Sequence, residues 1–245
     1  MNNTEKLIEM GLKEKAEASI LKAKEILLQA IPNEEIISIY VKGSYVQGEL
    51  RPDSDVDIVV ILKGDKYLPS IYELTEKFGN TTEPPFQAIG YTLDELKTGQ
   101  WSLNRPRKST TISVFVKHMD QLPLIYGNKP VEQLFTRTDI KDLRALLSFF
   151  EESYLSGFEK GIVKFGGLVK IVLWLVEREQ RALGMKPDYS WQKLADSVED
   201  ENHIVHLALK LRRQDEITKE EQDIFVEKLK TYLDFLKEKY KKEVK

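Results

Sequence analysis

The chain has 245 residues, which is long enough for one large domain or two modest ones. Its 37 lysines and arginines against 40 aspartates and glutamates give a formal net charge of −3, so charge gives no case for nonspecific nucleic-acid binding. The absence of cysteine excludes disulfides and thiolate metal sites. The sequence has neither an apolar run of about 18 residues nor a signal-peptide pattern, so we expect a cytoplasmic protein with no membrane span.

The first half of the sequence alternates helical and strand patterns. An apolar stripe predicts a first helix over 4–30, which Pro32 ends. The segment 56–62 is almost continuously β-branched, which predicts a strand buried on both faces. The segment 111–122 fits a strand and a helix equally well. The remaining predicted elements are strands at 36–42, 86–91 and 124–126, a helix at 68–78, and a short helix capped by Thr92.

The second half has a different character, because its periodicity is helical throughout. Thr218 followed by Glu221 has the pattern of a capping box. We therefore expect an α+β protein, with a mixed-sheet domain over 1–130 and an α-helical bundle over 131–245. The predicted helices of the bundle are 139–160, 165–183, 190–198, 203–212 and 218–242.

The most informative motif joins the first two predicted strands. Gly43 and Ser44 follow the first strand, and Asp55 and Asp57 stand at alternate positions where the second begins. Residues two apart on a strand point to the same side, so the two carboxylates would share a small volume. Their mutual repulsion requires a cation, and such oxygen ligands suit Mg²⁺ with substrate phosphates completing its shell. Glycine permits close backbone approach, so the amides that follow it can face a phosphate.

These residues and their spacing resemble the signature of the DNA polymerase β-type nucleotidyltransferase superfamily. Within the spacer, Gly-Glu-Leu-Arg-Pro-Asp-Ser-Asp-Val-Asp over 48–57 is similar to the streptomycin- and spectinomycin-type aminoglycoside adenylyltransferases. The resemblance implies a two-domain enzyme that uses Mg²⁺ and transfers AMP from ATP to a hydroxyl of a small molecule. It also implies Asp55 and Asp57 as catalytic metal ligands, Gly43 and Ser44 as nucleotide contacts, and an aminoglycoside-type antibiotic as one candidate acceptor.

One departure from the family pattern concerns the general base. The family usually has a third carboxylate on a neighbouring strand, and that position falls here at Gln87, which is neither a base nor a good metal ligand. Glu83, in the preceding loop, is one candidate replacement. A second explanation takes a carboxylate from the helical half, and a third is nucleotide binding without catalysis. The candidates in the helical half are Glu151, Glu152 and Glu177.

A further resemblance lies in the helical half, where Ser190 and Lys193 are similar to a family motif that contacts the triphosphate. Lys193 is therefore a candidate nucleotide ligand, although an N-cap serine with a solvated lysine explains the pattern equally well. Trp101, Tyr189 and Trp191 flank loops and are candidates to line a substrate pocket. Trp174 fits an apolar helix stripe, which favours core packing.

Two other functions remain open at this point. One is a noncatalytic nucleotide sensor that kept the metal pair and has Gln87 where the base should be. The other is an antitoxin-like transferase that attaches AMP to a protein, which the long helical half disfavours. The helical half has two interpretations. It is a substrate-recognition domain that closes over the nucleotide, or it is a module for packing and dimerisation, in which case the protein would be a homodimer.

Overall fold

The computed structural model describes residues 3–106, 111–214 and 216–240. It divides into two compact units, Met1–Thr136 and Arg137–Lys245, and each is described by itself. The division lies slightly C-terminal to the boundary after residue 130 that the sequence suggests. Among the described helices, none is both long enough and apolar enough to cross a bilayer.

The first unit is built on a four-stranded sheet in the order β3-β2-β1-β4. The strands are β1 (Ile36–Lys42), β2 (Val56–Leu62), β3 (Phe86–Thr92) and β4 (Leu124–Gly127). β1 runs antiparallel to both β2 and β4, whereas β2 runs parallel to β3. The sheet is therefore mixed, and the predicted α+β class is confirmed.

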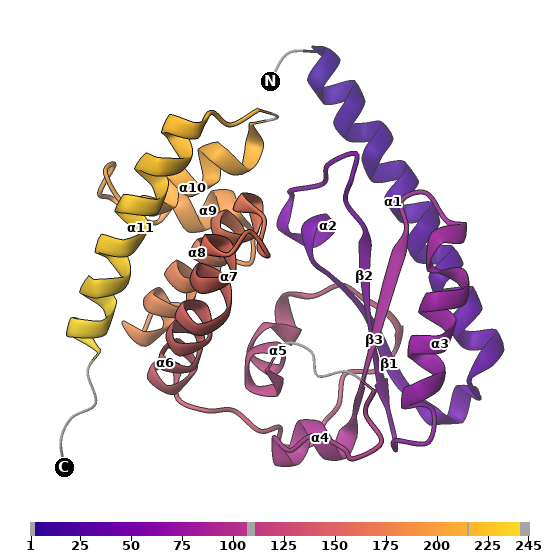
Figure 1. The fold of residues 1–245 in the computed structure, drawn as a ribbon. Coiled ribbons are helices and arrows are strands. Elements are labelled where there is room, and N and C mark those ends of the chain that lie inside the picture. The colour runs from indigo at the N-terminus through magenta and orange to yellow at the C-terminus, as the bar shows by residue number, and fades with distance from the viewer. Residues whose placement is uncertain (1–2, 107–110, 215, 241–245) are drawn as a thin grey trace, which may run out of the picture. The chain divides into compact units, whose positions relative to one another are not determined.

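Two long helices, α1 (Asn3–Ala30) and α3 (Leu68–Phe78), cover one face of this sheet (Figure 1). The apolar stripe of α1 packs on the inward side chains of β1, β2 and β3, which alternate along each strand. Burying these aliphatic side chains supplies the main stabilisation of the unit. The cluster includes Ala16, Ile20, Ala23 and Leu27 from α1, and Val56, Ile58, Val60 and Leu62 from β2.

The helix α5 (Ile112–His118) covers part of the other face of the sheet. The ambiguous segment 111–122 forms this helix, and the ring of Phe115 stacks on Tyr91 with centroids 4.6 Å apart. The ring of Phe115 also meets Tyr40 edge-on, so aromatic packing covers part of this face. The other short elements are α2 (Ser44–Gln47), α4 (Leu93–Thr98) and the 3₁₀ turns Asn33–Glu35, Gly79–Thr81 and Met119–Gln121.

The second unit is helical, as the sequence predicts. The expected helix 139–160 is divided into α6 (Asp139–Phe149), a π-helical segment (Phe150–Leu155) and α7 (Ser156–Glu159). The capping box of Thr218 and Glu221 begins the last helix, and the end predicted for that helix, 241–242, lies outside the described residues. The remaining helices are α8 (Phe165–Ala182), α9 (Trp191–Asp196), α10 (Ile204–Arg213) and α11 (Lys219–Lys239).

The tryptophans of this unit mostly serve its core. Trp174 packs against the apolar cluster of α8, α10 and α11, as its helix stripe predicts. Trp191 is 3% exposed and belongs to the same core, so its prediction as a pocket residue is corrected. Trp191 is the first residue of α9. Its side chain points inward because the buried face of this helix consists of Trp191, Leu194 and Ala195.

Candidate functional site

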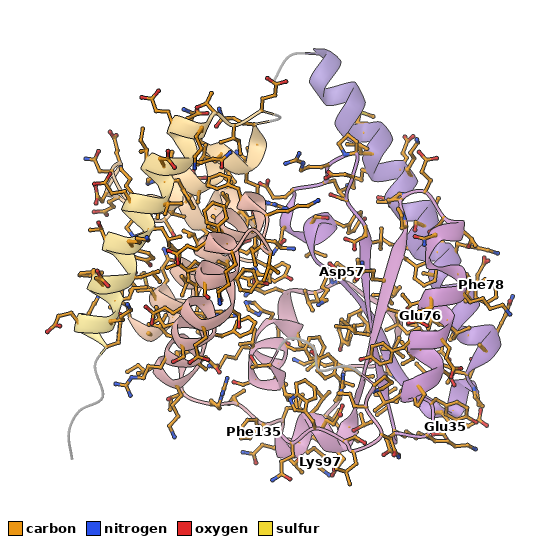
Figure 2. The ribbon with its side chains drawn as sticks, viewed as in Figure 1. Glu35, Asp57, Glu76, Phe78, Lys97 and Phe135 are labelled. Atoms are coloured by element: carbon orange, nitrogen blue, oxygen red, sulfur yellow. The ribbon has the colours of Figure 1, made fainter. Side chains whose placement is uncertain are left out.

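Asp57 lies in a row of three polar side chains that crosses the sheet. The register pairs it with Lys42 of β1 on one side and with Gln87 of β3 on the other. Its neighbours Val56 and Ile58 belong to the core beneath α1 and α3, so strand alternation places Asp57 on the opposite face. Figure 2 shows Asp57 toward the α2 end of the sheet, and Lys97 and Phe135 near its other end.

Gly43, between β1 and α2, lies directly against the carboxylate of Asp57. A Cβ added to Gly43 would stand 2.0 Å from Oδ2 of Asp57, so no other residue fits without displacing that carboxylate. The backbone angles of Gly43, φ 77° and ψ −153°, belong to a region that is open essentially to glycine alone. The glycine of the motif is therefore required twice, by its conformation and by the closeness of Asp57.

Ser44 and Asp55 complete the motif around this contact. Ser44 is the first residue of α2 and is half-buried, as are Asp55 and Asp57. Asp55 immediately precedes β2, after a turn in which the amide of Arg51 donates to Oγ of Ser54 at 2.9 Å. Ser54 is thus a turn residue, as its sequence position predicts.

The donor set at this end of the sheet suits a magnesium ion that shares its shell with a substrate. Two aspartates supply hard oxygen ligands, and Mg²⁺ is commonly held by one or two carboxylates plus substrate phosphates. Within the described residues, no three acidic or histidine side chains gather closely enough to form a complete metal cage. The residues present therefore fit a metal that arrives with a nucleotide.

The register bears directly on the missing third carboxylate. Gln87 is the residue of β3 opposite Asp57, and its side chain is exposed. An uncharged amide therefore stands beside Asp57, at the strand position where the resemblance expects a carboxylate.

Glu83 is directed elsewhere. Its Oε1 accepts a hydrogen bond from Nζ of Lys15 on α1 at 2.7 Å, and this contact lowers the pKa of the carboxyl. The hydroxyl of Ser19, also on α1, donates to the carbonyl of Pro84 at 2.7 Å and fixes the loop to that helix. Since α1 covers the face opposite Asp57, the structure does not bring the Glu83 carboxylate to the aspartate pair.

Two of the three carboxylates considered in the helical half are held by cations. Glu177 is buried and forms ion pairs with Arg178 and Arg181. Glu151 forms an ion pair with Lys237, and Glu152 is exposed. These ion pairs engage the carboxylates of Glu151 and Glu177 within the second unit.

Lys193 lies on the exposed face of α9. Its Nζ is 3.0 Å from Oδ2 of Asp188, and the amide of Ser190 donates to Oδ1 of Asp188 at 2.9 Å. The hydrogen bond from Ser190, and then the contact with Lys193, lower the pKa of the Asp188 carboxyl. Lys193 thus helps to fix the start of α9, and its contact with a triphosphate stays a prediction.

A buried ion pair between Glu95 and Arg105 is the feature that sequence reasoning missed. Nε and Nη2 of Arg105 donate to the two carboxylate oxygens of Glu95 at 2.9 and 2.6 Å, and both side chains are almost fully buried. Burial opposes ionisation of Glu95, but the hydrogen bonds from Arg105, Ser102 and Thr92 outweigh it and lower the pKa. The Arg105 guanidinium also lies 4.4 Å from the ring centroid of Trp101.

This ion pair fixes the loop that follows α4. Trp101 stacks on Tyr91, and the Arg105 guanidinium lies over both rings, so these contacts help to hold the loop. Trp101 is half-buried, and its role in lining a substrate pocket stays a prediction. The capping position of Thr92 with Glu95 is the only sequence signal near this network, and it indicates the helix start but not the arginine.

Comparisons with known proteins agree with this geometry. Residues 20–100, about a third of the chain, match the family model of the nucleotidyltransferase domain. The matched residues lie in the first unit, and the predicted resemblance to the DNA polymerase β-type nucleotidyltransferases is confirmed. No curated protein sequence matches the chain.

A solved structure extends the likeness of fold to most of the chain. It is the spectinomycin adenyltransferase AAD(9) from Enterococcus faecialis, crystallised with ATP and spectinomycin. The match has a TM-score of 0.57 at 17% identity, and it covers 92% of this chain and 99% of that chain. At this identity the likeness describes the fold.

Proposed function

We propose that this protein is a magnesium-dependent nucleotidyltransferase that moves a nucleoside monophosphate, with AMP from ATP as the first candidate, to a small-molecule acceptor. The observation that carries the proposal is the contact between Asp57 and the backbone of Gly43, next to Asp55, within a nucleotidyltransferase domain. The likeness of fold to an enzyme crystallised with ATP and spectinomycin supports the choice of donor and acceptor class.

Each residue of the site has a distinct task in this reaction. Asp55 and Asp57 would hold Mg²⁺, which neutralises phosphate charge and favours departure of pyrophosphate. Gly43 lets a phosphate approach the backbone, and Ser44 offers a hydroxyl and an amide beside it. The protein then acts mainly by positioning the α-phosphorus for in-line attack.

A noncatalytic nucleotide sensor is the second candidate, and Gln87 is the observation that favours it. A site that binds a nucleotide needs the aspartate pair, whereas a hydroxyl acceptor also needs a proton acceptor. The two candidates differ in turnover: the sensor binds Mg²⁺ and ATP but releases no pyrophosphate with any acceptor. Aminoglycosides and lincosamides are the first acceptors to test, since the sequence resemblance points to antibiotics.

The test is calorimetric titration with Mg²⁺ and a nonhydrolysable ATP analogue, together with pyrophosphate release from ATP. We expect Asp57→Asn to lose metal-dependent nucleotide binding and to lower turnover by about 100-fold or more. Asp53→Asn is the matched control, because Asp53 is an exposed aspartate of the adjacent turn, paired with Arg51. Unchanged binding and turnover in Asp57→Asn would refute the assignment.

A further inference from the structure

The charges of the row across the sheet bear on the chemistry of the acceptor. The row runs from Lys42, a cation, through Asp57, an anion, to Gln87, a neutral amide. We propose that the attacking oxygen of the acceptor is already anionic, as in a phosphomonoester or a carboxylate, instead of a neutral hydroxyl. This acceptor class presupposes the nucleotidyl transfer proposed above and specifies its nucleophile.

The first reason concerns the proton. A hydroxyl must lose its proton as it attacks phosphorus, and a positioned carboxylate or imidazole ordinarily accepts it. The side chain beside Asp57 is the amide of Gln87, which takes up no proton near neutral pH. Within the described part of the first unit, no third acidic or histidine side chain joins the aspartates as a metal ligand. A phosphomonoester or a carboxylate is ionised at neutral pH, so its attack requires no base.

The second reason concerns repulsion. A third carboxylate beside Asp57 would place another negative charge next to an anionic acceptor and raise the energy of its approach. The amide of Gln87 adds no charge and offers two N–H donors to an oxyanion. Lys42, at the register position on the other side of Asp57, adds a positive charge to the same row. A neutral donor and a cation on either side of the metal ligand suit an anion better than an alcohol.

The reaction balances without a proton. The acceptor oxyanion forms a bond to the α-phosphorus, and the bond from that phosphorus to the bridging oxygen of pyrophosphate breaks. Pyrophosphate leaves with the electron pair. The product is a phosphoanhydride when the acceptor is a phosphomonoester, and a mixed carboxylic–phosphoric anhydride when it is a carboxylate.

The first experiment measures the binding of two simple anions to the full chain. The protein is saturated with Mg²⁺ and a nonhydrolysable ATP analogue and is then titrated with inorganic phosphate or with acetate. We expect saturable binding of at least one anion, and this affinity falls about tenfold or more in Gln87→Glu. The titration that binds identifies the phosphate or the carboxylate as the acceptor group.

Gln100→Glu is the matched control, because it makes the same change at an exposed residue that follows α4, beyond the other end of β3. We expect Gln100→Glu to change anion affinity less than twofold, and saturation with Mg²⁺ and the nucleotide analogue is verified for each of the three proteins before the anion is added. Absence of anion binding in the wild type, or equal affinity in Gln87→Glu, overturns the proposal. Failure of the nucleotide analogue to bind refutes the proposed function instead.

A turnover experiment provides a second, independent readout. Pyrophosphate release is compared with glycerol and glycerol 3-phosphate, and with glucose and gluconate, with the products identified by mass spectrometry. Anhydride formation with the charged member of either pair supports the proposal. Ester formation on a neutral sugar, glycerol or an aminoglycoside overturns it and leaves nucleotidyl transfer itself intact.

Discussion

The substitution Gly43→Ala tests the contact that defines the site. The new methyl group would stand 2.0 Å from Oδ2 of Asp57 and 3.0 Å from its Cγ, so the Asp57 carboxylate must move by more than an ångström. The backbone at φ 77° and ψ −153° is also strained for alanine, at a cost of about 2 kcal/mol. We therefore expect a loss of folding stability of about that size, and a larger effect on the site.

The loss of function follows from the displacement. Moving a metal ligand by about 1 Å costs on the order of 100-fold in rate when the reaction depends on positioning. Urea unfolding measures the stability, and calorimetric titration with Mg²⁺ and a nonhydrolysable ATP analogue measures the site. Pyrophosphate release completes the comparison where an acceptor has been found.

Gly48→Ala separates the two effects. Gly48 also has a positive φ, 71°, but an added Cβ meets nothing within 4 Å. We expect this variant to lose about 1 kcal/mol through backbone strain and to keep its nucleotide affinity. Equal nucleotide affinity in Gly43→Ala and Gly48→Ala would refute the placement of Asp57 against Gly43.

Four further predictions concern stability. Arg105→Met leaves Glu95 buried without its partner and should cost about 3–5 kcal/mol in urea unfolding. The pKa of Glu95 is lowered from its ordinary 4.5, so its contribution to stability is present above pH 4.5 and is lost as pH falls through the folded pKa; Glu95→Gln should remove this dependence. Burial lowers the pKa of His203 from 6.5, and Nδ1 of His203 accepts a hydrogen bond from the amide of Val205 at the start of α10. The free energy of unfolding should therefore fall as pH drops below 6.5, and His203→Asn should remove this pH dependence. Thr218→Ala removes the cap of α11 and should cost about 1 kcal/mol, and an unchanged unfolding midpoint would contradict that role.

The sequence was sufficient for the strands and the motif they carry. A β-branched run from Val56 onward can only be buried, and the alternation of Asp55 and Asp57 follows from local geometry. The register that brings Gln87 beside Asp57 agrees with the position at which the family pattern expects a carboxylate. Local pattern therefore predicted the part of the site that lies on adjacent strands.

Other features depended on contacts that local pattern does not encode. The helix α5 contains β-branched residues, which are also common in strands. The packing of Phe115 on Tyr91 and Tyr40 favours the helix, and local pattern does not predict this packing. Glu83 lies in a loop whose composition does not predict toward which face of the sheet its side chain points. The hydrogen bond from Lys15 on α1 fixes the direction of the Glu83 side chain. Arg105 reaches Glu95 through the path of an irregular loop, which no periodicity predicts.

The outer strand β3 also has a bearing on how this protein behaves at high concentration. Edge strands offer backbone groups that can pair with another chain. Here the hydroxyl of Thr75 accepts from the amide of Ala88 at 3.1 Å, and Nη2 of Arg105 donates to the carbonyl of Gly90 at 2.5 Å. Side chains thus occupy two of the backbone groups that a neighbouring strand would use, which makes this edge of the sheet less open to pairing with another chain.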